Sequence, residues 1–193
     1  MNVDKNFWEE KFRNKQTGFD IGSVSSPLKN YFDQLKNKNL KILIPGSGNG
    51  HEAEYLYKNS FNNVYVLDWS ELAIKNFTSR FPDFPKENIF NENFFEHKGS
   101  YDLIVEQTFF CALNPTLRKD YVVKTHSLLK KNGKLAGLLF NKDFGNPFPP
   151  FGGSKDEYIN LFEPYFNFKY FDNCYNSIPP RAGTELFINI IKK

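Results

Sequence analysis

The chain has 193 residues, which is enough for one well-buried domain and short for two. Its net charge of +3 is mild and its lysines are scattered among acids, so we expect no nucleic-acid partner. No apolar run reaches the length of a membrane span, and residues 1–11 lack the apolar stretch of a secretory signal, so we expect a cytoplasmic protein without a membrane partner.

Helical and strand-like segments alternate along the chain, separated by turn signals and without an internal repeat. The predicted helices cover residues 4–12, 28–35, 52–58, 71–80, 115–130 and 154–162, and the predicted strands cover residues 41–45, 64–68, 88–94, 101–106, 134–140, 166–175 and 185–191. This alternation predicts a layered α/β fold that closes with an antiparallel strand pair. We expect a single domain over residues 1–193.

The most informative segment links the first two predicted strands. The cluster Gly46-Ser47-Gly48-Asn49-Gly50 follows the first strand, and Asp68 ends the second. A glycine cluster lets the backbone turn sharply and approach a ligand closely, and an acidic side chain at the end of the next strand can accept hydrogen bonds from ribose hydroxyls. The order of these features predicts an adenosine-cofactor site rather than a simple turn.

Two classes of adenosine cofactor fit this order to different degrees. A dinucleotide site needs a third glycine beyond Gly50 and places a pyrophosphate at the start of the next helix. Glu52 and Glu54 occupy that helix start and would repel a pyrophosphate. S-adenosylmethionine has no phosphate and carries cationic groups, so the sequence favours it; an NAD-dependent oxidoreductase is the first alternative.

Longer motifs add a resemblance that extends from Trp8 to Gly183. They are the spaced aromatics Trp8, Phe12 and Phe19, then Phe19-Asp20-x-Gly22, Pro45-Gly46-x-Gly48-x-Gly50, Gln107 to Pro115 with Arg118 and Tyr121, Asn146 to Phe151, and Ile178-Pro179-x-Arg181-x-Gly183. Together they resemble the thiopurine S-methyltransferase superfamily, especially its thiol and halide methyltransferases. This resemblance implies a three-layer Rossmann-like sandwich with a mostly parallel seven-stranded sheet and an antiparallel last strand pair. It also implies that residues 1–36 form an N-terminal lid.

The resemblance also implies roles for particular residues. The cofactor-binding candidates are Trp8, Phe12 and Phe19 in the lid, Gly46 and Gly48 near the methionine part, Asp68 at the ribose, Asn93 and Phe94 at the adenine, and Gln107 after the fourth strand. Aromatic faces attract a sulfonium through cation-π interaction. By spacing alone, Trp8 and Phe12 also fit an ordinary amphipathic core helix, and Phe94 also fits a core position.

Methyl transfer is an in-line displacement, so the protein chiefly holds acceptor and sulfonium in line and excludes water. A soft acceptor such as a thiol is already partly anionic near neutral pH, and we therefore predict no catalytic triad and no metal. Arg181 and Asp20 are the acceptor-site candidates: Arg181 could attract an anion, and Asp20 could orient an acceptor or act as a weak base. Cys111 lies in an apolar segment and is interpreted as buried packing.

We therefore predict an S-adenosylmethionine-dependent methyltransferase that acts on a small thiol or another soft nucleophile, such as a thiopurine, sulfide or halide, and releases S-adenosylhomocysteine. We expect a small-molecule acceptor and a monomer or weak dimer. Phe12, Phe19 and Gln107 depart from the residues usual in the thiol and halide branch. These departures motivate the second alternative, a non-catalytic cofactor-binding module.

Overall fold

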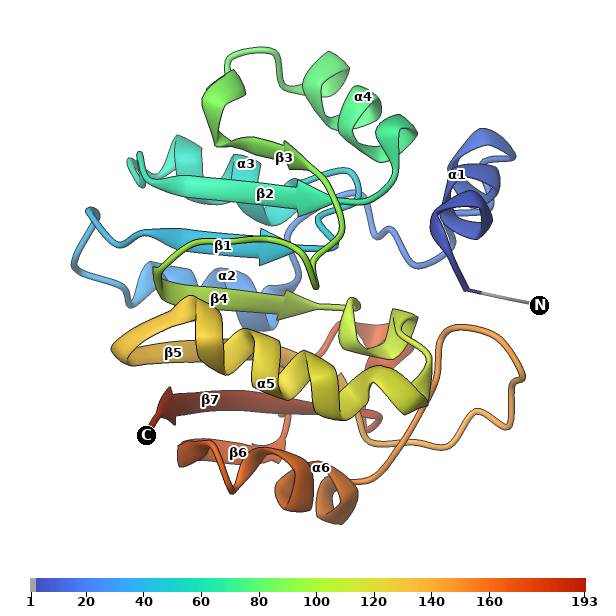
Figure 1. Ribbon diagram of the computed structural model, residues 1–193, viewed down its shortest axis with the longest axis vertical. Helices are drawn as coiled ribbons and strands as arrows, with labels where there is room; N and C mark the ends of the chain where they lie inside the picture. The colour runs from blue at the N-terminus through green and yellow to red at the C-terminus, as the bar shows by residue number, and fades with distance from the viewer. Residues whose placement is uncertain (1–2) are drawn as a thin grey trace. The chain divides into compact units, whose positions relative to one another are not determined.

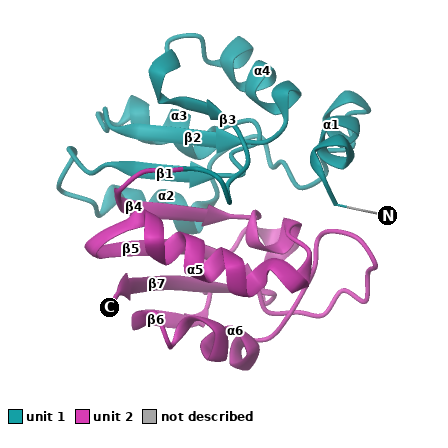
Figure 2. Ribbon diagram, in the orientation of Figure 1, with its two compact units in different colours: residues 1–97 teal, residues 98–193 magenta. Residues whose placement is uncertain are grey.

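A computed structural model describes residues 3–193, so the first two residues of the predicted lid lie outside the described part. The chain divides into two compact units, residues 1–97 and residues 98–193 (Figure 2). The elements that carry the cofactor motif all belong to the first unit. The predicted last strand pair belongs to the second.

Helices and strands alternate through most of the described chain (Figure 1). The α-helices are α1 (Lys5–Arg13), α2 (Ser26–Asp33), α3 (His51–Lys58), α4 (Glu71–Arg80), α5 (Arg118–Leu128) and α6 (Lys155–Phe162). The strands are β1 (Ile42–Pro45), β2 (Val64–Asp68), β3 (Ile89–Asn91), β4 (Tyr101–Gln107), β5 (Leu129–Phe140), β6 (Phe166–Asn173) and β7 (Glu185–Lys192). Short 3₁₀ turns cover η1 (Lys86–Asn88), η2 (Phe110–Ala112), η3 (Pro115–Leu117) and η4 (Pro179–Arg181).

In the first unit, three parallel strands form the framework of the glycine loop. Ile42 of β1 pairs with Val64 of β2, and Val66 of β2 pairs with Ile89 of β3. Helix α3 packs on β2, α4 packs on β2 and β3, and α1 packs on α4. Because helices cover the sheet, β1 is buried along its whole length, which explains its continuous apolar sequence.

In the second unit, β4 and β5 run parallel, with Leu103 opposite Lys134. Strand β7 is antiparallel to both β5 and β6, so the closing antiparallel pair is confirmed. Helix α5 packs on β5 and contacts α6 (Figure 1). The strand order is β3-β2-β1-β4-β5-β7-β6, which confirms the mostly parallel seven-stranded α/β sheet predicted from the sequence.

Some predicted boundaries were wrong for identifiable reasons. The helix predicted over residues 115–130 is a 3₁₀ turn at Pro115–Leu117 followed by α5, which ends at Leu128. Strand β5 begins at Leu129 because this residue pairs with Tyr101 across the sheet, before the register shifts to Leu103 opposite Lys134. Long-range pairing thus removes the last two residues of the predicted helix.

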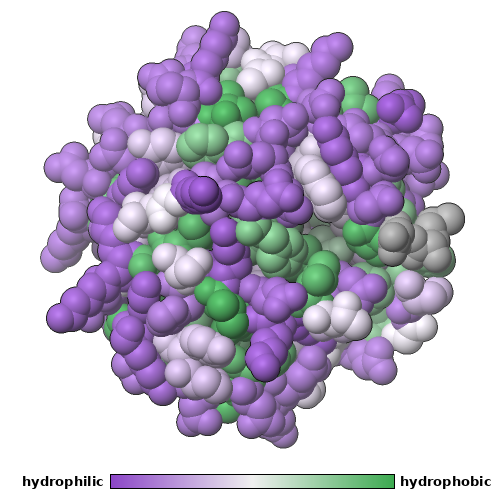
Figure 3. All heavy atoms as spheres, in the orientation of Figure 1, coloured by the Kyte–Doolittle hydropathy of each residue, from purple (hydrophilic) through white to green (hydrophobic). Residues whose placement is uncertain are grey.

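The face displayed in Figure 3 is mostly hydrophilic, with smaller hydrophobic areas between polar side chains. The large hydrophobic side chains that are exposed among residues 3–193 are those of Trp69, Val123, Phe148, Tyr170 and Tyr175. None of the helices formed by residues 3–193 combines the length and the apolarity needed to cross a membrane.

Candidate functional site: the cofactor loop and its lid

The loop between β1 and α3, residues 46–50, is called the cofactor loop here. Gly48 and Gly50 adopt φ values of +53° and +68°, a left-handed conformation that glycine adopts without strain. A Cβ atom at Gly50 would overlap the Phe77 ring, so α4 leaves no space for a side chain there. The loop therefore turns tightly enough to bring the Gly48 N–H to the end of β2.

Asp68 ends β2 and anchors this loop. One carboxylate oxygen accepts the Gly48 N–H at 2.8 Å, and the other accepts the Ser70 N–H at 2.9 Å. Burial, with a smaller contribution from the nearby Glu9 carboxylate, raises the pKa of Asp68 to about 6. The Asp68 carboxylate therefore holds the turn that follows β2 through Ser70, and its second oxygen also reaches the predicted cofactor loop.

The three predicted lid aromatics form one cluster. The Phe19 ring packs edge-on against both Trp8 and Phe12, with 5.9 Å between ring centroids in each pair. A Cβ atom built on Gly48 would lie 3.8 Å from the Phe12 ring, so the cluster lies directly beside the cofactor loop. The structure therefore brings Trp8, Phe12, Phe19, Gly48 and Asp68 together within the first unit.

Polar contacts dock α1, the helix of the predicted lid, on the start of α4. The Glu9 carboxylate accepts the backbone N–H of Glu71, and the Lys5 ammonium lies 2.6 Å from the Glu71 carboxylate. The free N–H groups at a helix start favour such an acceptor. Glu9 thus connects the lid to α4 and also places a second carboxylate close enough to Asp68 to affect its pKa.

The fit of S-adenosylmethionine to this site can be judged from two hydrogen-bond acceptor atoms in the cofactor loop. Ser47 Oγ and Asn49 Oδ1 are buried and have no hydrogen-bond partner among residues 3–193. A buried acceptor without a donor is costly, and the ammonium of the methionine part would supply donors. Glu52, buried in the first turn of α3, adds a carboxylate that suits cations and disfavours a pyrophosphate. The residues present therefore fit this cofactor.

The adenine-contact candidates follow β3. The Asn93 side chain accepts the Phe95 N–H at 3.0 Å, and Phe94 is 3 % exposed with its ring packed edge-on against Phe95. Phe94 therefore has the burial of a core residue, the alternative that its sequence position also allowed. The Asn91 side chain bridges to the carbonyl oxygens of Asp68 and Trp69, which connects the ends of β3 and β2.

In the second unit, Gln107 is the last residue of β4, and the preceding Glu106 organises the chain beyond it. The fully buried Glu106 accepts the N–H groups of Phe109 and Phe110 at 2.8 and 2.9 Å, and the Tyr121 hydroxyl at 2.6 Å. Burial raises the pKa of Glu106 to about 7, although the three donors oppose this effect. Glu106 thus fixes the path of the motif that begins at Gln107.

Arg181 lies in η4 of the same unit and is largely buried. Its guanidinium is 3.5 Å from the Glu185 carboxylate and 5.7 Å from the centre of the Phe140 ring.

Cys111 is buried in η2, and burial raises the pKa of its thiol well above the usual range. The thiol therefore stays protonated, which supports its interpretation as packing rather than as a nucleophile.

Sequence reasoning missed several polar groups around these motifs. Glu9 stands directly after the predicted lid residue Trp8, and Glu106 is an acidic residue inside an otherwise apolar strand. The second pattern is a usable signal, since a charged residue in a buried strand needs dedicated hydrogen-bond partners. Among residues 3–193, no group of three or more His, Cys, Asp or Glu side chains could hold a metal ion.

Comparison with known protein families matches almost the whole chain. The family model described as "Thiopurine S-methyltransferase (TPMT)" matches residues 3–186. "Probable thiol methyltransferase 2" of Arabidopsis thaliana is 29% identical over 185 residues, covering 92% of this chain and 81% of that protein. "Thiocyanate methyltransferase 1" of Brassica oleracea is 27% identical over 191 residues, covering 95% and 83%. "Thiopurine S-methyltransferase" of Photobacterium profundum is 24% identical over 180 residues, covering 83% of each protein.

Solved structures share the fold. Magnesium protoporphyrin IX methyltransferase from Synechocystis, crystallised with bound S-adenosylmethionine, has a TM-score of 0.76 at 12% identity and covers 100% of this chain and 98% of its own. The 1,6-didemethyltoxoflavin-N1-methyltransferase of Burkholderia thailandensis has a TM-score of 0.75 at 15% identity and covers 99% and 87%. At these identities the likeness concerns the fold alone.

Proposed function

Because the chain belongs to the thiopurine S-methyltransferase family, we propose that its S-adenosylmethionine-dependent methyl transfer is directed to a small thiol or a related soft nucleophile. The observation that carries this proposal is the family match over residues 3–186, which includes both the lid and the segment after β4. The relatives named as thiol, thiocyanate and thiopurine methyltransferases support a sulfur acceptor.

The first unit supplies the cofactor side of this reaction. Asp68 would accept the ribose hydroxyls, Gly46 and Gly48 would give the methionine part a close approach to the backbone, and the aromatic cluster of Trp8, Phe12 and Phe19 would cover the sulfonium. We assign Asn93 and Phe94 to the same cofactor site on the basis of their positions after β3. Gln107, the last residue of β4, keeps the cofactor-binding role that the family resemblance implies. When bound, the cofactor supplies a methyl group activated by the adjacent positive sulfur.

The second unit supplies the strongest acceptor-site candidate. Arg181 places a largely buried cation beside the Phe140 ring, and burial makes its attraction for a thiolate or hydrosulfide stronger than in water. Glu185 holds the guanidinium in place. The protonated Cys111 thiol and the engaged Asp20 carboxylate are poor bases, which agrees with an acceptor that arrives already ionised.

Transfer of a labelled methyl group from S-adenosylmethionine to a panel of acceptors tests the proposal. The panel contains hydrosulfide, a small alkyl thiol, a thiopurine, iodide and a phenol. We expect transfer to sulfur or halide and none to the phenol, because an unionised oxygen acceptor needs a base. Transfer to the phenol alone would overturn the soft-nucleophile assignment.

The same preparation separates the two alternatives. Tight S-adenosylhomocysteine binding without transfer to any acceptor would favour a non-catalytic cofactor-binding module. Saturable NAD binding in place of S-adenosylhomocysteine binding would favour an oxidoreductase. We further propose a single methyltransferase domain with residues 1–36 as its lid, which acts in the cytoplasm as a monomer or weak dimer.

A further inference from the structure

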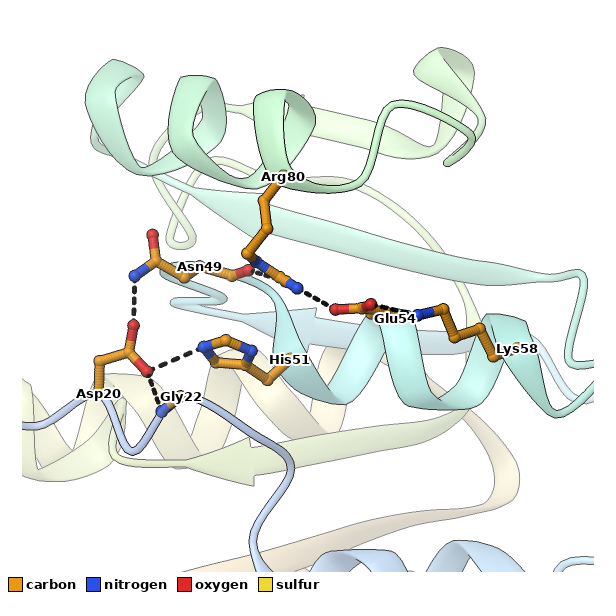
Figure 4. Close-up of polar contacts among 7 residues, drawn as sticks. All are labelled: Asp20, Gly22, Asn49, His51, Glu54, Lys58 and Arg80. Atoms are coloured by element: carbon orange, nitrogen blue, oxygen red, sulfur yellow. Dashed lines mark hydrogen bonds and ion pairs between the residues drawn. The ribbon is translucent and has the colours of Figure 1, made fainter.

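Asp20, in the loop that follows the lid helix, is held by three partners (Figure 4). Its first carboxylate oxygen accepts the Gly22 N–H at 2.7 Å and lies 2.8 Å from His51 Nε2. Its second oxygen accepts the Asn49 side-chain amide. Asn49 lies in the cofactor loop and His51 starts α3, so one carboxylate joins the loop that contains Asp20 to both. We call this set of contacts the Asp20 clamp.

Asn49 is itself fixed from the opposite side. Arg80 of α4 donates to the Asn49 carbonyl oxygen at 2.6 Å and is paired with the Glu54 carboxylate of α3. Glu54 also lies 2.6 Å from the Lys58 ammonium (Figure 4). The Asp20 clamp therefore ends on a residue that α3 and α4 already hold, rather than on a mobile surface group.

The neighbours of Asp20 and Asn49 in the chain determine which parts of the site the clamp connects. Phe19, the preceding residue, is the ring that contacts both Trp8 and Phe12. On the other side, Asn49 follows Gly48, whose N–H binds Asp68. The clamp thus connects the aromatic lid to the loop and the acidic residue expected to hold the cofactor.

These contacts leave Asp20 poorly suited to proton transfer. Hydrogen bonds, the largest from His51, hold the pKa of the Asp20 carboxyl well below its usual range despite partial burial. Each carboxylate oxygen already has a protein partner, and the side chain is 17 % exposed. The geometry favours a role in holding the loop over a role as a base.

We propose that Asp20 is a positioning residue that clamps the lid loop onto the cofactor loop through Asn49 and His51, and so slows the release of cofactor and product. This inference rests on the proposed function, because it places S-adenosylmethionine under the aromatic lid. It predicts a specific loss when the clamp is broken: faster ligand release with an intact fold.

The first test needs no cofactor. We expect hydrogen exchange of the backbone amides of residues 17–22 to rise about 10-fold in Asp20→Ala, as the loss of roughly 1.4 kcal/mol of local stabilisation requires. Asp33→Ala is the matched control, since Asp33 is an exposed carboxylate in α2 of the same unit with partners Lys29 and Tyr55. Exchange in Asp20→Ala no faster than in the control would overturn the clamp.

Exchange of donor and acceptor provides a rescue. Asn49→Asp places two carboxylates face to face and should loosen the loop. The double variant Asp20→Asn with Asn49→Asp restores a donor facing an acceptor and keeps an oxygen for Gly22 and His51, so we expect lid exchange within about twofold of the parent. A double variant as loose as Asn49→Asp alone would refute the pairing.

The second readout is S-adenosylhomocysteine release. In a Trp69→Phe background, Trp8 is the only tryptophan left of two, so its fluorescence reports on the lid. We expect about 10-fold faster release and a raised KM for S-adenosylmethionine in Asp20→Ala, with the KM for the acceptor within about twofold of the parent. Equal rises in both KM values would overturn the positioning role. A parent protein that fails to bind S-adenosylhomocysteine would instead overturn the proposed function.

Discussion

Glu106→Gln provides a test of how the second unit is stabilised. Glu106 is a buried carboxyl whose three donors are Phe109 N–H, Phe110 N–H and the Tyr121 hydroxyl. A glutamine at this position keeps an oxygen for the two N–H groups and offers an amide donor to the Tyr121 oxygen. The substitution therefore removes the ionisation of Glu106 while preserving its contacts.

The expected effect on stability follows from the pKa of Glu106. Burial raises this pKa from the ordinary value of 4.5 to about 7. A carboxyl with a raised folded-state pKa contributes fully to stability below its unfolded-state pKa and loses that contribution as pH rises through the folded-state value. The whole shift is worth about 3 kcal/mol, most of which falls between pH 5 and pH 8.

Urea unfolding at several pH values between 5 and 8 measures this effect. We expect the free energy of unfolding of Glu106→Gln, relative to the parent, to rise by about 2–3 kcal/mol from pH 5 to pH 8. Glu163→Gln, at an exposed position of the same unit, should follow the parent at every pH. A constant difference between Glu106→Gln and the parent across this range would refute the reasoning.

Substitutions at three further positions test the cofactor and acceptor sides. Asp68→Ala should weaken S-adenosylmethionine binding by about 1–3 kcal/mol in titration calorimetry, through the loss of charge-assisted hydrogen bonds to ribose. Arg181→Ala should raise the KM for hydrosulfide more than the KM for S-adenosylmethionine, whereas Arg181→Lys keeps the charge and should lose less. Gly48→Ala should lower stability by about 1–2 kcal/mol in denaturant unfolding, because the φ of +53° is strained for alanine.

For each of these substitutions, one result would contradict the expectation. Unchanged calorimetric affinity in Asp68→Ala would remove Asp68 from the cofactor site. Parallel losses for both substrates in Arg181→Ala would indicate damage to the buried pair with Glu185 instead of lost acceptor binding. Parent-like stability of Gly48→Ala would show that the cofactor loop relaxes out of its left-handed conformation.

The geometry of the cofactor loop was predictable because its signals are local. Gly46 to Gly50 and Asp68 each stand at the end of a strand whose apolar sequence is unambiguous, and parallel strands bring such ends to one edge of the sheet. The start of β5 was not predictable, because Leu129 leaves the helical pattern only through its pairing with Tyr101. Local propensity cannot anticipate a contact made between residues so far apart in sequence.

The polar connections around the site escaped prediction for the same reason. The anchoring role of Glu9 depends on the packing of α1 against α4, which brings its carboxylate within hydrogen-bond distance of the Glu71 N–H. The Asp20 clamp likewise joins residues 29 and 31 positions apart. Such long-range polar contacts have no periodicity, whereas aromatic spacing in the lid follows the helix and could be recognised beforehand.

The lid also bears on the interpretation of the chain as a non-catalytic module. Phe12 and Phe19 stand where tryptophan is usual in the thiol and halide branch, and a phenyl ring attracts a cation less than an indole does. Even so, both rings pack in the cluster with Trp8 rather than pointing apart. Polar anchors at Glu9 and Asp20 hold this cluster on α4 and on the cofactor loop. If the two phenyl rings attract the sulfonium more weakly, these polar anchors supply a larger share of the free energy that holds the lid over the cofactor. We therefore expect the loss of either anchor to weaken cofactor retention more than replacement of either phenylalanine by leucine.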